Sequence, residues 1–226
     1  MKDRKTKIMH KKRFWLLFFI LGFCVLGFGL TGGFNKKMIY NMDSIGKNII
    51  CFGDSITFSK GSDKGKDYPS VLSKLTGLPV INAGINEDTS GGGLKRLESD
   101  VLSKDPLLVI IEFSGNDFLF KLPIADTFKN VEEMIKRIQS KRAMVAVADI
   151  SSGIIMGEYK EGFRKLANKY NAIFIPSVLS GIVTEPSLKS DVMHPNNEGY
   201  KIVAHRVYRQ ILPYLNRNAL SRNLKK

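Results

Sequence analysis

Five short apolar runs alternate along the chain with longer stretches in which apolar residues recur at helical spacing. The runs are rich in Val, Ile and Phe and have few polar interruptions, as expected for strands that are covered on both faces. They span 48–52, 79–83, 107–113, 143–149 and 172–176. Amphipathic helices are predicted between them and at the end, over 68–76, 92–103, 125–141, 157–170 and from Pro195 to about Leu215. This alternation predicts an α/β protein, a three-layer α/β/α sandwich with a five-stranded parallel sheet.

The N-terminus departs from this alternation. A basic stretch, residues 1–13, precedes 21 residues without a charge, 14–34. The densest apolar part, Trp15–Leu30, is longer than the ~7–15 residues of a usual signal peptide core and slightly shorter than the ~20 that span a bilayer. We expect one hydrophobic helix that anchors the protein in a membrane. A cleaved signal peptide, which would leave a secreted or periplasmic domain, and a buried core helix are the alternatives. Because basic ends stay in the cytoplasm, the domain is expected to be exported.

The net charge of +14 lies mainly at the two ends of the chain. Residues 1–37 contribute +8 and residues 214–226 contribute +4, which leaves only +2 for the part between them. A basic face on the domain is therefore not expected, and a nucleic-acid partner is disfavoured. The expected organisation is a basic cytoplasmic segment, an anchor, a linker, a folded domain and a frayed basic tail: 1–13, 14–34, 35–46, 47–215 and 216–226.

Ser55 follows the first predicted strand directly, in the sequence Gly53-Asp54-Ser55. Ligands of open parallel sheets bind at the carboxyl ends of the strands, so a nucleophilic serine would be well placed there. Gly-Asp-Ser taken alone is also an ordinary polar turn. The two cysteines support neither a disulfide framework nor a metal cluster, and we expect no metal and no organic cofactor.

A nucleophilic serine needs a base, and the chain has only three histidines. His10 precedes the predicted anchor, and His205 stands in a predicted helix, where a structural or solvent-facing role is expected. His194 stands in a loop before the last helix, with Asp191 three residues upstream. That spacing lets the carboxylate orient one ring nitrogen while the other points outward as a base. A polar turn that caps the last helix is the alternative.

Two further polar loops follow predicted strands. Gly115-Asn116-Asp117 stands at the end of the third strand, and a long polar loop follows the second. An asparagine amide and loop backbone amides are suitable donors for a developing oxyanion. Polar motifs at several strand ends favour acyl-transfer chemistry.

In order and spacing, four motifs resemble the four blocks of the SGNH (GDSL) hydrolase family, and most of all its bacterial thioesterase I/lysophospholipase/arylesterase branch. The resemblance covers roughly residues 47–214 and implies the family's flavodoxin-like, five-stranded parallel sheet. The motifs are Gly53-Asp54-Ser55, Asn82-Ala83-Gly84 with Asp88-Thr89, Gly115-Asn116-Asp117, and Asp191-x-x-His194.

The resemblance implies Ser55 as the nucleophile, His194 as the base and Asp191 as the residue that orients it. The oxyanion would be held by the backbone N–H of Ser55, the side-chain amide of Asn116 and a backbone N–H of the second block. The family usually has glycine before Asp-Thr, where this chain has Glu87. A glutamate can disfavour a glycine-type backbone angle or bring a carboxylate close to the oxyanion. Gly84 is the alternative donor, although a structural turn is expected of it.

The expected function is therefore a serine ester hydrolase, esterase-, thioesterase- or lysophospholipase-like, that acts on small-molecule or lipid esters and thioesters through an acyl-enzyme. The alternatives are an acetyl-esterase or acyltransferase on cell-envelope glycans, and a membrane-tethered binding domain with weak catalysis. A flavodoxin-like nucleotide binder is a third possibility, but the chain has no phosphate loop, and this function would leave the Ser, Asn, Asp and His motifs unexplained. The apolar residues after the third block either line an acyl pocket or pack in the core: Phe118, Leu119, Phe120 and Leu122.

Overall fold

All five predicted strands form one parallel sheet in the computed structural model, which describes residues 38–151 and 156–224. The strands are β1 (Asn48–Gly53), β2 (Val80–Gly84), β3 (Pro106–Glu112), β4 (Met144–Ala148) and β5 (Ile173–Ile175). Every ladder is parallel, and the strand order is β2-β1-β3-β4-β5. The predicted five-stranded parallel sheet is confirmed, with the order of the flavodoxin-like fold.

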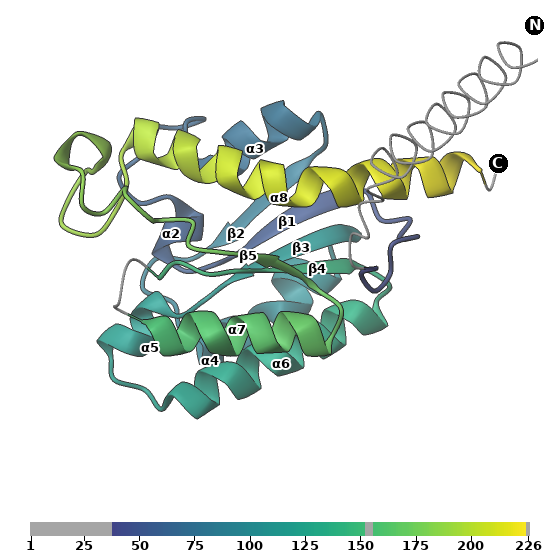
Figure 1. Ribbon diagram of the computed structural model, residues 1–226, viewed down its shortest axis with the longest axis horizontal. Helices are drawn as coiled ribbons and strands as arrows, with labels where there is room; N and C mark the ends of the chain where they lie inside the picture. Colours follow the sequence, from purple (N-terminus) through teal and green to yellow (C-terminus); the bar gives the residue numbers. More distant parts are fainter. Residues whose placement is uncertain (1–37, 152–155, 225–226) are drawn as a thin grey trace, which may run out of the picture. The chain divides into compact units, whose positions relative to one another are not determined.

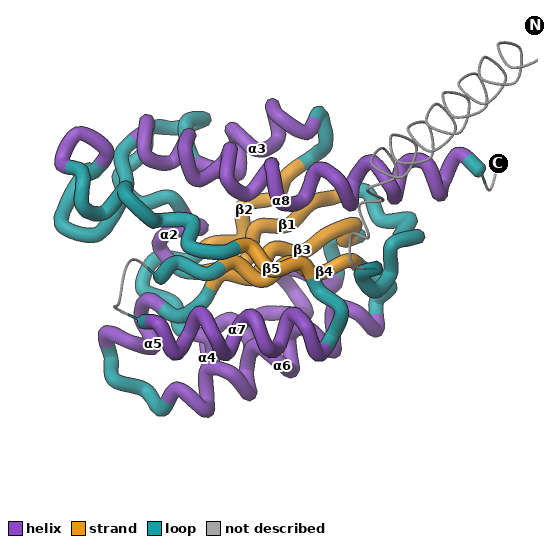
Figure 2. The backbone as a smooth tube through the Cα atoms, in the orientation of Figure 1, coloured by secondary structure: helices purple, strands orange, loops and turns teal. Residues whose placement is uncertain are grey.

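Helices cover both faces of the sheet (Figures 1 and 2). On one face lie α3 (Tyr68–Thr76) and α8 (Asn197–Asn223). On the other lie α4 (Ser90–Leu97), α6 (Ile124–Ser140) and α7 (Gly157–Lys169). Shorter helical segments follow strands or join helices: α2 (Ser55–Phe58), η1 (Glu98–Leu102), α5 (Gly115–Leu119) and η2 (Pro186–Leu188).

The central strands are apolar at nearly every position because the sheet separates two cores. In β1, Ile49 and Cys51 pack with α3 and α8, whereas Ile50 and Phe52 pack with α4 and α6. Successive side chains of a strand point to opposite faces, so a strand covered on both sides needs apolar residues throughout. The continuous runs in the sequence therefore predicted the third layer as well as the strands.

Two predicted boundaries differ from the structure. The helix predicted over 92–103 begins at Ser90 and changes at Glu98 into the π-helical segment η1. The tail predicted to fray over 216–226 is helical to Asn223, because α8 continues past its internal Pro213. Asn218 is buried there, and its Nδ2 donates to the carbonyl oxygens of Met42 (2.9 Å) and Ser44 (2.8 Å).

The folded domain also begins before the predicted boundary at residue 47. Ile39 and Ser44 are buried, so part of the expected linker 35–46 belongs to the domain. The predicted anchor, 14–34, lies outside the described residues. Among the residues that are described, no helix is both long enough and apolar enough to cross a bilayer.

Candidate active site

Ser55, His194 and Asp191 form a hydrogen-bonded row. The Oγ of Ser55 lies 3.0 Å from Nε2 of His194, and Nδ1 of the same ring lies 2.9 and 2.8 Å from the two carboxylate oxygens of Asp191. Ser55 and His194 are buried, whereas the Asp191 side chain is 46% exposed. The three residues that the sequence singled out are therefore within the distances that nucleophilic catalysis requires.

Ser55 is the first residue of α2, immediately beyond the end of β1. Asp54 is the N-cap of this short helix, and its Oδ1 accepts the N–H of Ile56 at 3.0 Å. The N–H of a first helical residue has no partner within its helix, so that of Ser55 is available to a ligand. Gly53 permits the close approach of β3 and α2, because a Cβ there would lie 2.3 Å from both the Glu112 carbonyl oxygen and Oγ1 of Thr57.

Asp191 folds the loop that carries the imidazole. Its Oδ1 accepts the backbone N–H groups of Met193 (2.9 Å) and His194 (2.8 Å) as well as the ring contact. Desolvation opposes the charged carboxylate, but these hydrogen bonds outweigh it and lower the pKa of Asp191 to about 2. The carboxylate is therefore ionised at neutral pH and fixes Nδ1 as the protonated ring nitrogen. The other histidine in the domain, His205, faces solvent as predicted.

Asn116 reaches the same cavity from α5, at the end of β3. Its Nδ2 donates to the carbonyl oxygen of Asp88 at 2.8 Å. An amide nitrogen carries two hydrogens, so a second one is left for a ligand. Asn116 lines the cavity together with Ser55 and Glu87. The order of the strands explains this meeting, because β3 lies beside β1 in the sheet.

Glu87 adopts the backbone conformation that glycine would adopt. Its φ is +63°, in the left-handed region, which costs a non-glycine residue about 1–2 kcal/mol. The chain thus keeps a glycine-type turn despite the substitution, and the Glu87 side chain is exposed. The alternative donor, Gly84, is wrong: its N–H is bonded to Oδ1 of Asn82 at 2.9 Å. A Cβ at Gly84 would lie 2.0 Å from the Phe58 nitrogen, so this glycine serves packing against α2.

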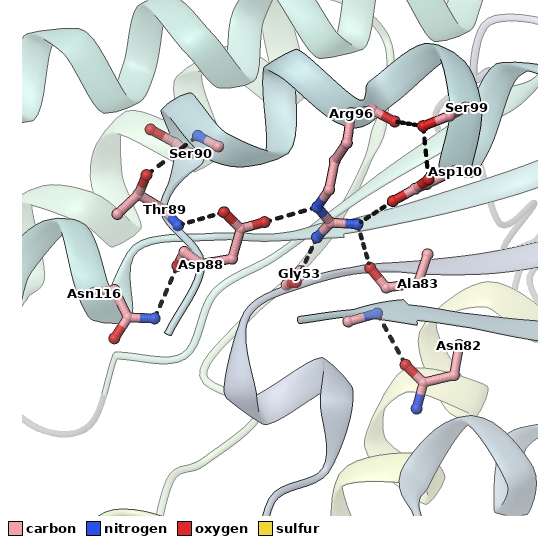
Figure 3. A network of polar contacts seen from close by, with 12 residues as sticks. Gly53, Asn82, Ala83, Asp88, Thr89, Ser90, Arg96, Ser99, Asp100 and Asn116 are labelled. Atoms are coloured by element: carbon pink, nitrogen blue, oxygen red, sulfur yellow. Dashed lines mark hydrogen bonds and ion pairs between the residues drawn. The ribbon is translucent and has the colours of Figure 1, made fainter. Parts of the chain in front are cut away.

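Arg96, on α4, anchors the loop of the second block (Figure 3). Its Nε donates to Oδ2 of Asp88 at 2.7 Å, in an ion pair whose side chains are 14% and 11% exposed. The same guanidinium donates to the carbonyl oxygens of Ala83 (2.8 Å) and Gly53 (3.0 Å). It therefore ties the ends of β1 and β2 to the residue whose carbonyl accepts from Asn116. Sequence reasoning missed Arg96, and its only signal was a lone arginine eight residues after Asp88.

Three buried carboxyl groups lie behind the site. Asp117 accepts from the N–H of Ser90 (2.8 Å) and from its hydroxyl (2.5 Å), which ties the third block to the start of α4. Burial raises the pKa of Asp54 to about 7. Burial and the neighbouring charge of Asp54 raise the pKa of Glu112 well above its ordinary value. The carboxyl groups of Asp54 and Glu112 together therefore hold a proton at pH values where an exposed carboxyl would have lost it.

A cavity of about 470 Å³ opens beside Ser55. Its floor carries the polar groups described above, and its walls are largely apolar. Phe118, Leu119 and Phe120 line it while remaining 43–56% exposed, so they belong to the cavity wall and not to the core. Leu122 is also exposed and lines a neighbouring hollow. Other apolar wall residues come from loops after β4, β5 and η2: Ile150, Met156, Leu179, Val183, Val192 and Met193.

The described residues contain no group of three or more His, Cys, Asp or Glu side chains that could hold a metal ion. Cys51 is buried in the sheet, and burial raises the pKa of its thiol to about 12, which makes it a poor nucleophile. Ser55, His194 and Asn116 all line the cavity.

A parallel α/β sheet that presents this row beside amide donors defines a serine hydrolase. More specifically, residues 51–202 match the model of the GDSL-like Lipase/Acylhydrolase family, and the chain belongs to this family.

Relatives support the same class at modest identity. The chain is 26% identical to "Esterase TesA" of Pseudomonas aeruginosa over 197 residues, which covers 82% of this chain and 98% of the relative. It is 27% identical to "Arylesterase" of Vibrio mimicus over 180 residues, covering 75% and 90%. The crystal structure of the esterase EstA of Pseudoalteromonas, inhibited by monoethylphosphonate, superimposes with a TM-score of 0.67 at 25% identity, covering 75% and 99%. The protein is a carboxylic ester hydrolase of the SGNH type.

Proposed function

We propose that the protein hydrolyses esters or thioesters through an acyl-enzyme on Ser55. The observation that carries the proposal is the 3.0 Å contact between Oγ of Ser55 and Nε2 of His194. His194 accepts the hydroxyl proton as Oγ attacks the carbonyl carbon, and it returns that proton to the departing alcohol or thiol. A water molecule then attacks the acyl-enzyme, with the same imidazole as its base. Asp191 holds the ring in the required tautomer and stabilises its protonated form.

Three donors would hold the oxyanion of each tetrahedral intermediate: the N–H of Ser55, the N–H of Glu87 and the amide of Asn116. Each comes from a different strand end, and all three residues line one cavity. Donors fixed in advance cost no reorganisation when charge develops, and a single one contributes about 10²–10³ in kcat. The left-handed backbone of Glu87 supports its place in this set.

The apolar walls favour an acyl group longer than acetyl. Each methylene that moves from water into such a wall contributes about 0.8 kcal/mol, or about fourfold in kcat/KM where the binding is retained in the transition state. Acetyl would leave most of the 470 Å³ cavity unused.

The acetyl-esterase or acyltransferase on cell-envelope glycans is the second candidate, because the cavity lies partly open to solvent through its exposed wall residues. Residues 14–34 would hold the domain on the outer side of the membrane, or would be removed as a signal peptide.

The test is hydrolysis of p-nitrophenyl acetate, butyrate, octanoate and palmitate by the full chain and by Ser55→Ala. We expect activity that rises from acetate to octanoate and disappears in the variant. Ser140→Ala is the matched control and should keep full activity, because Ser140 is an exposed serine at the end of α6 that does not line the cavity. A fluorophosphonate probe should label the wild type and the control but not Ser55→Ala. Preference for acetate would support the glycan candidate, and absence of both turnover and labelling would favour a binding domain.

A further inference from the structure

Glu112, the last residue of β3, lies behind the site and has no part in the chemistry proposed above. It is 2% exposed, and Asp54, which directly precedes Ser55, is 1% exposed. Two carboxyl groups buried in this way cannot both be ionised at low cost, because each charge loses its hydration and repels the other. The negative charges of Asp88 and Asp117 also act on Asp54. The pair is therefore expected to keep one proton.

Glu112 holds the short helix α2 at two points. Its Oε2 accepts the hydroxyl of Thr57, the third residue of the helix, at 2.8 Å. Its carboxyl group also shares a hydrogen bond with that of Asp54, the N-cap of the same helix. α2 has only four residues, and a helix of that length is not stable by itself in water. The position of α2 is therefore set by its neighbours, and Glu112 is one of them.

The second carboxyl oxygen of Glu112, Oε1, is buried and has no donor among the described residues. The surroundings are tightly packed: a Cβ at Gly53 would lie 2.7 Å from Oε2 of Glu112, and one at Gly115 would lie 3.1 Å from Oδ2 of Asp54. A buried carboxylate oxygen without a donor is costly. A protonated carboxyl group avoids this cost, because its O–H can donate to a neighbouring carboxylate.

The contacts of the two carboxyl groups indicate which of them carries the proton. Burial raises the pKa of both, that of Asp54 to about 7. The hydrogen bond between them acts in opposite directions, since it lowers the pKa of Asp54 and raises that of Glu112. Oδ1 of Asp54 also accepts the N–H of Ile56 at 3.0 Å, which favours the ionised form. Glu112 is therefore the donor and Asp54 the acceptor.

The other ionisable groups that act on the pair are neutral at ordinary pH. The hydroxyl oxygen of Tyr68 lies 3.3 Å from Oγ1 of Thr57, and burial raises the pKa of this phenol well above its ordinary value. Burial likewise raises the pKa of the Tyr200 phenol and of the Cys51 thiol, which interacts with Tyr68. These three groups bring no charge that could replace the proton.

We propose that Glu112 is a positioning residue that remains a neutral acid in the working enzyme and donates its O–H to Asp54. Through this contact and the one with Thr57 it fixes α2, so that the N–H of Ser55 is held towards the oxyanion. An ionised Glu112 would instead repel Asp54 and add a second negative charge behind the developing oxyanion. The inference rests on the hydrolysis proposed above, because it concerns one of the donors named there.

Infrared spectroscopy tests the proton directly. At about pH 8 exposed carboxyl groups are ionised, so the carbonyl stretch of a protonated carboxyl group reports on a buried one. We expect this band in the wild type, and we expect it to shift when glutamate, but not aspartate, carries ¹³C in its side-chain carboxyl group. Glu112→Gln should lack the band, and Glu98→Gln, a change at an exposed glutamate of η1, should keep it. A wild type without the band, or a band that shifts only with labelled aspartate, would overturn the proposal.

Steady-state kinetics with p-nitrophenyl butyrate test the positioning. Glu112→Met keeps the length of the side chain but removes the O–H. We expect kcat to fall by about 10²-fold with little change in KM, because a misplacement of about 1 Å can cost that much. Glu112→Gln supplies a neutral N–H donor of the same shape and should recover most of this loss. Glu98→Met, the same change at the exposed glutamate, should keep the wild-type kcat.

A purely structural role would give another result. Glu112→Met would then unfold at lower denaturant while its folded form kept the wild-type kcat, and this outcome would overturn the proposal. An equal loss of kcat in the methionine and glutamine variants would also overturn it, because a neutral donor would then not be what matters. If Glu112→Met does not fold, the infrared bands and the kcat of Glu112→Gln decide the question. A wild type without turnover would refute the ester hydrolysis, whereas the infrared result would still show whether Glu112 is neutral.

Discussion

Replacement of Arg96 by methionine tests how the loop of the second block is held in place. This loop carries the Glu87 N–H, and we call it the oxyanion loop. Methionine keeps most of the apolar stem and removes the guanidinium. The change breaks the 2.7 Å ion pair with Asp88 and takes the donor from the carbonyl oxygens of Ala83 and Gly53. It also removes the cation that lies 4.4 Å from the ring centre of Phe52.

The magnitude follows from burial. The side chains of Arg96 and Asp88 are 14% and 11% exposed, so the carboxylate that remains is poorly solvated. Loss of one partner from a buried pair costs about 3–5 kcal/mol. Asp88 still accepts the N–H of Thr89 at 2.9 Å, so we expect the lower end, about 3 kcal/mol. Arg96→Lys keeps the charge but not the fork that reaches three groups, and should cost about 1–2 kcal/mol.

Denaturant unfolding and steady-state kinetics together measure the effect. Loosening the loop should displace the Glu87 N–H and the Asp88 carbonyl that holds Asn116, so kcat should fall by up to about 10²–10³ while KM changes little. The double variant with Asp88→Asn should recover part of the lost stability, because the uncompensated charge is gone.

Arg137→Met is the matched control. Its contact with Glu98 is 3.2 Å long, but the side chains are 37% and 62% exposed, so less than about 1 kcal/mol should be lost. The reasoning is refuted if the free energy of unfolding of Arg96→Met is within about 1 kcal/mol of that of this control and the variant retains wild-type kcat.

Three other outcomes are expected. Asn116→Ala should lower kcat by about 10²–10³ with little change in KM, and an equal change in both constants would deny it an oxyanion role. Glu87→Gly should relieve about 1–2 kcal/mol of left-handed strain and lose about 0.5–1 kcal/mol to chain entropy, which leaves a small gain in stability that thermal unfolding can measure; a clear loss would contradict the strain argument. The free energy of unfolding should fall as pH rises from about 4 to about 7, because folding raises the pKa of Asp54 and Glu112 and the folded state holds a proton that the unfolded chain releases. Glu112→Gln should flatten this slope in denaturant titrations, and an unchanged slope would show that other groups cause it.

Much of the fold follows from local pattern. The apolar runs predicted all five strands, since a strand covered on both faces must be apolar at nearly every position. The same runs placed Ser55, Glu87 and Asn116 just beyond strand ends. In a parallel sheet these ends share one edge, so the convergence of the motifs could be expected before any contact was known.

The conformation of single residues was harder to predict. A glutamate before Asp-Thr raised the question of a glycine-type turn, but only the fold shows that the turn is kept at a φ of +63°. The sequence left Gly84 as an alternative donor because it does not show that the Gly84 N–H already donates to Asn82. That hydrogen bond depends on how β2 ends beside α2. The basic tail was predicted to fray because no local pattern shows the contacts that hold it. Its buried Asn218 binds residues that are 174 and 176 positions away in the chain.

The sequence by itself determined the elements, the parallel sheet and the residues able to carry the chemistry, because these depend on side-chain period and on motif spacing. The tertiary structure alone decided that β3 lies beside β1, that Arg96 joins two strand ends to the oxyanion loop, and that Phe118, Leu119 and Phe120 line a cavity. Ser55 and His194 are 139 residues apart in the chain and 3.0 Å apart in space. Contacts of that range arise from packing, which no local pattern encodes.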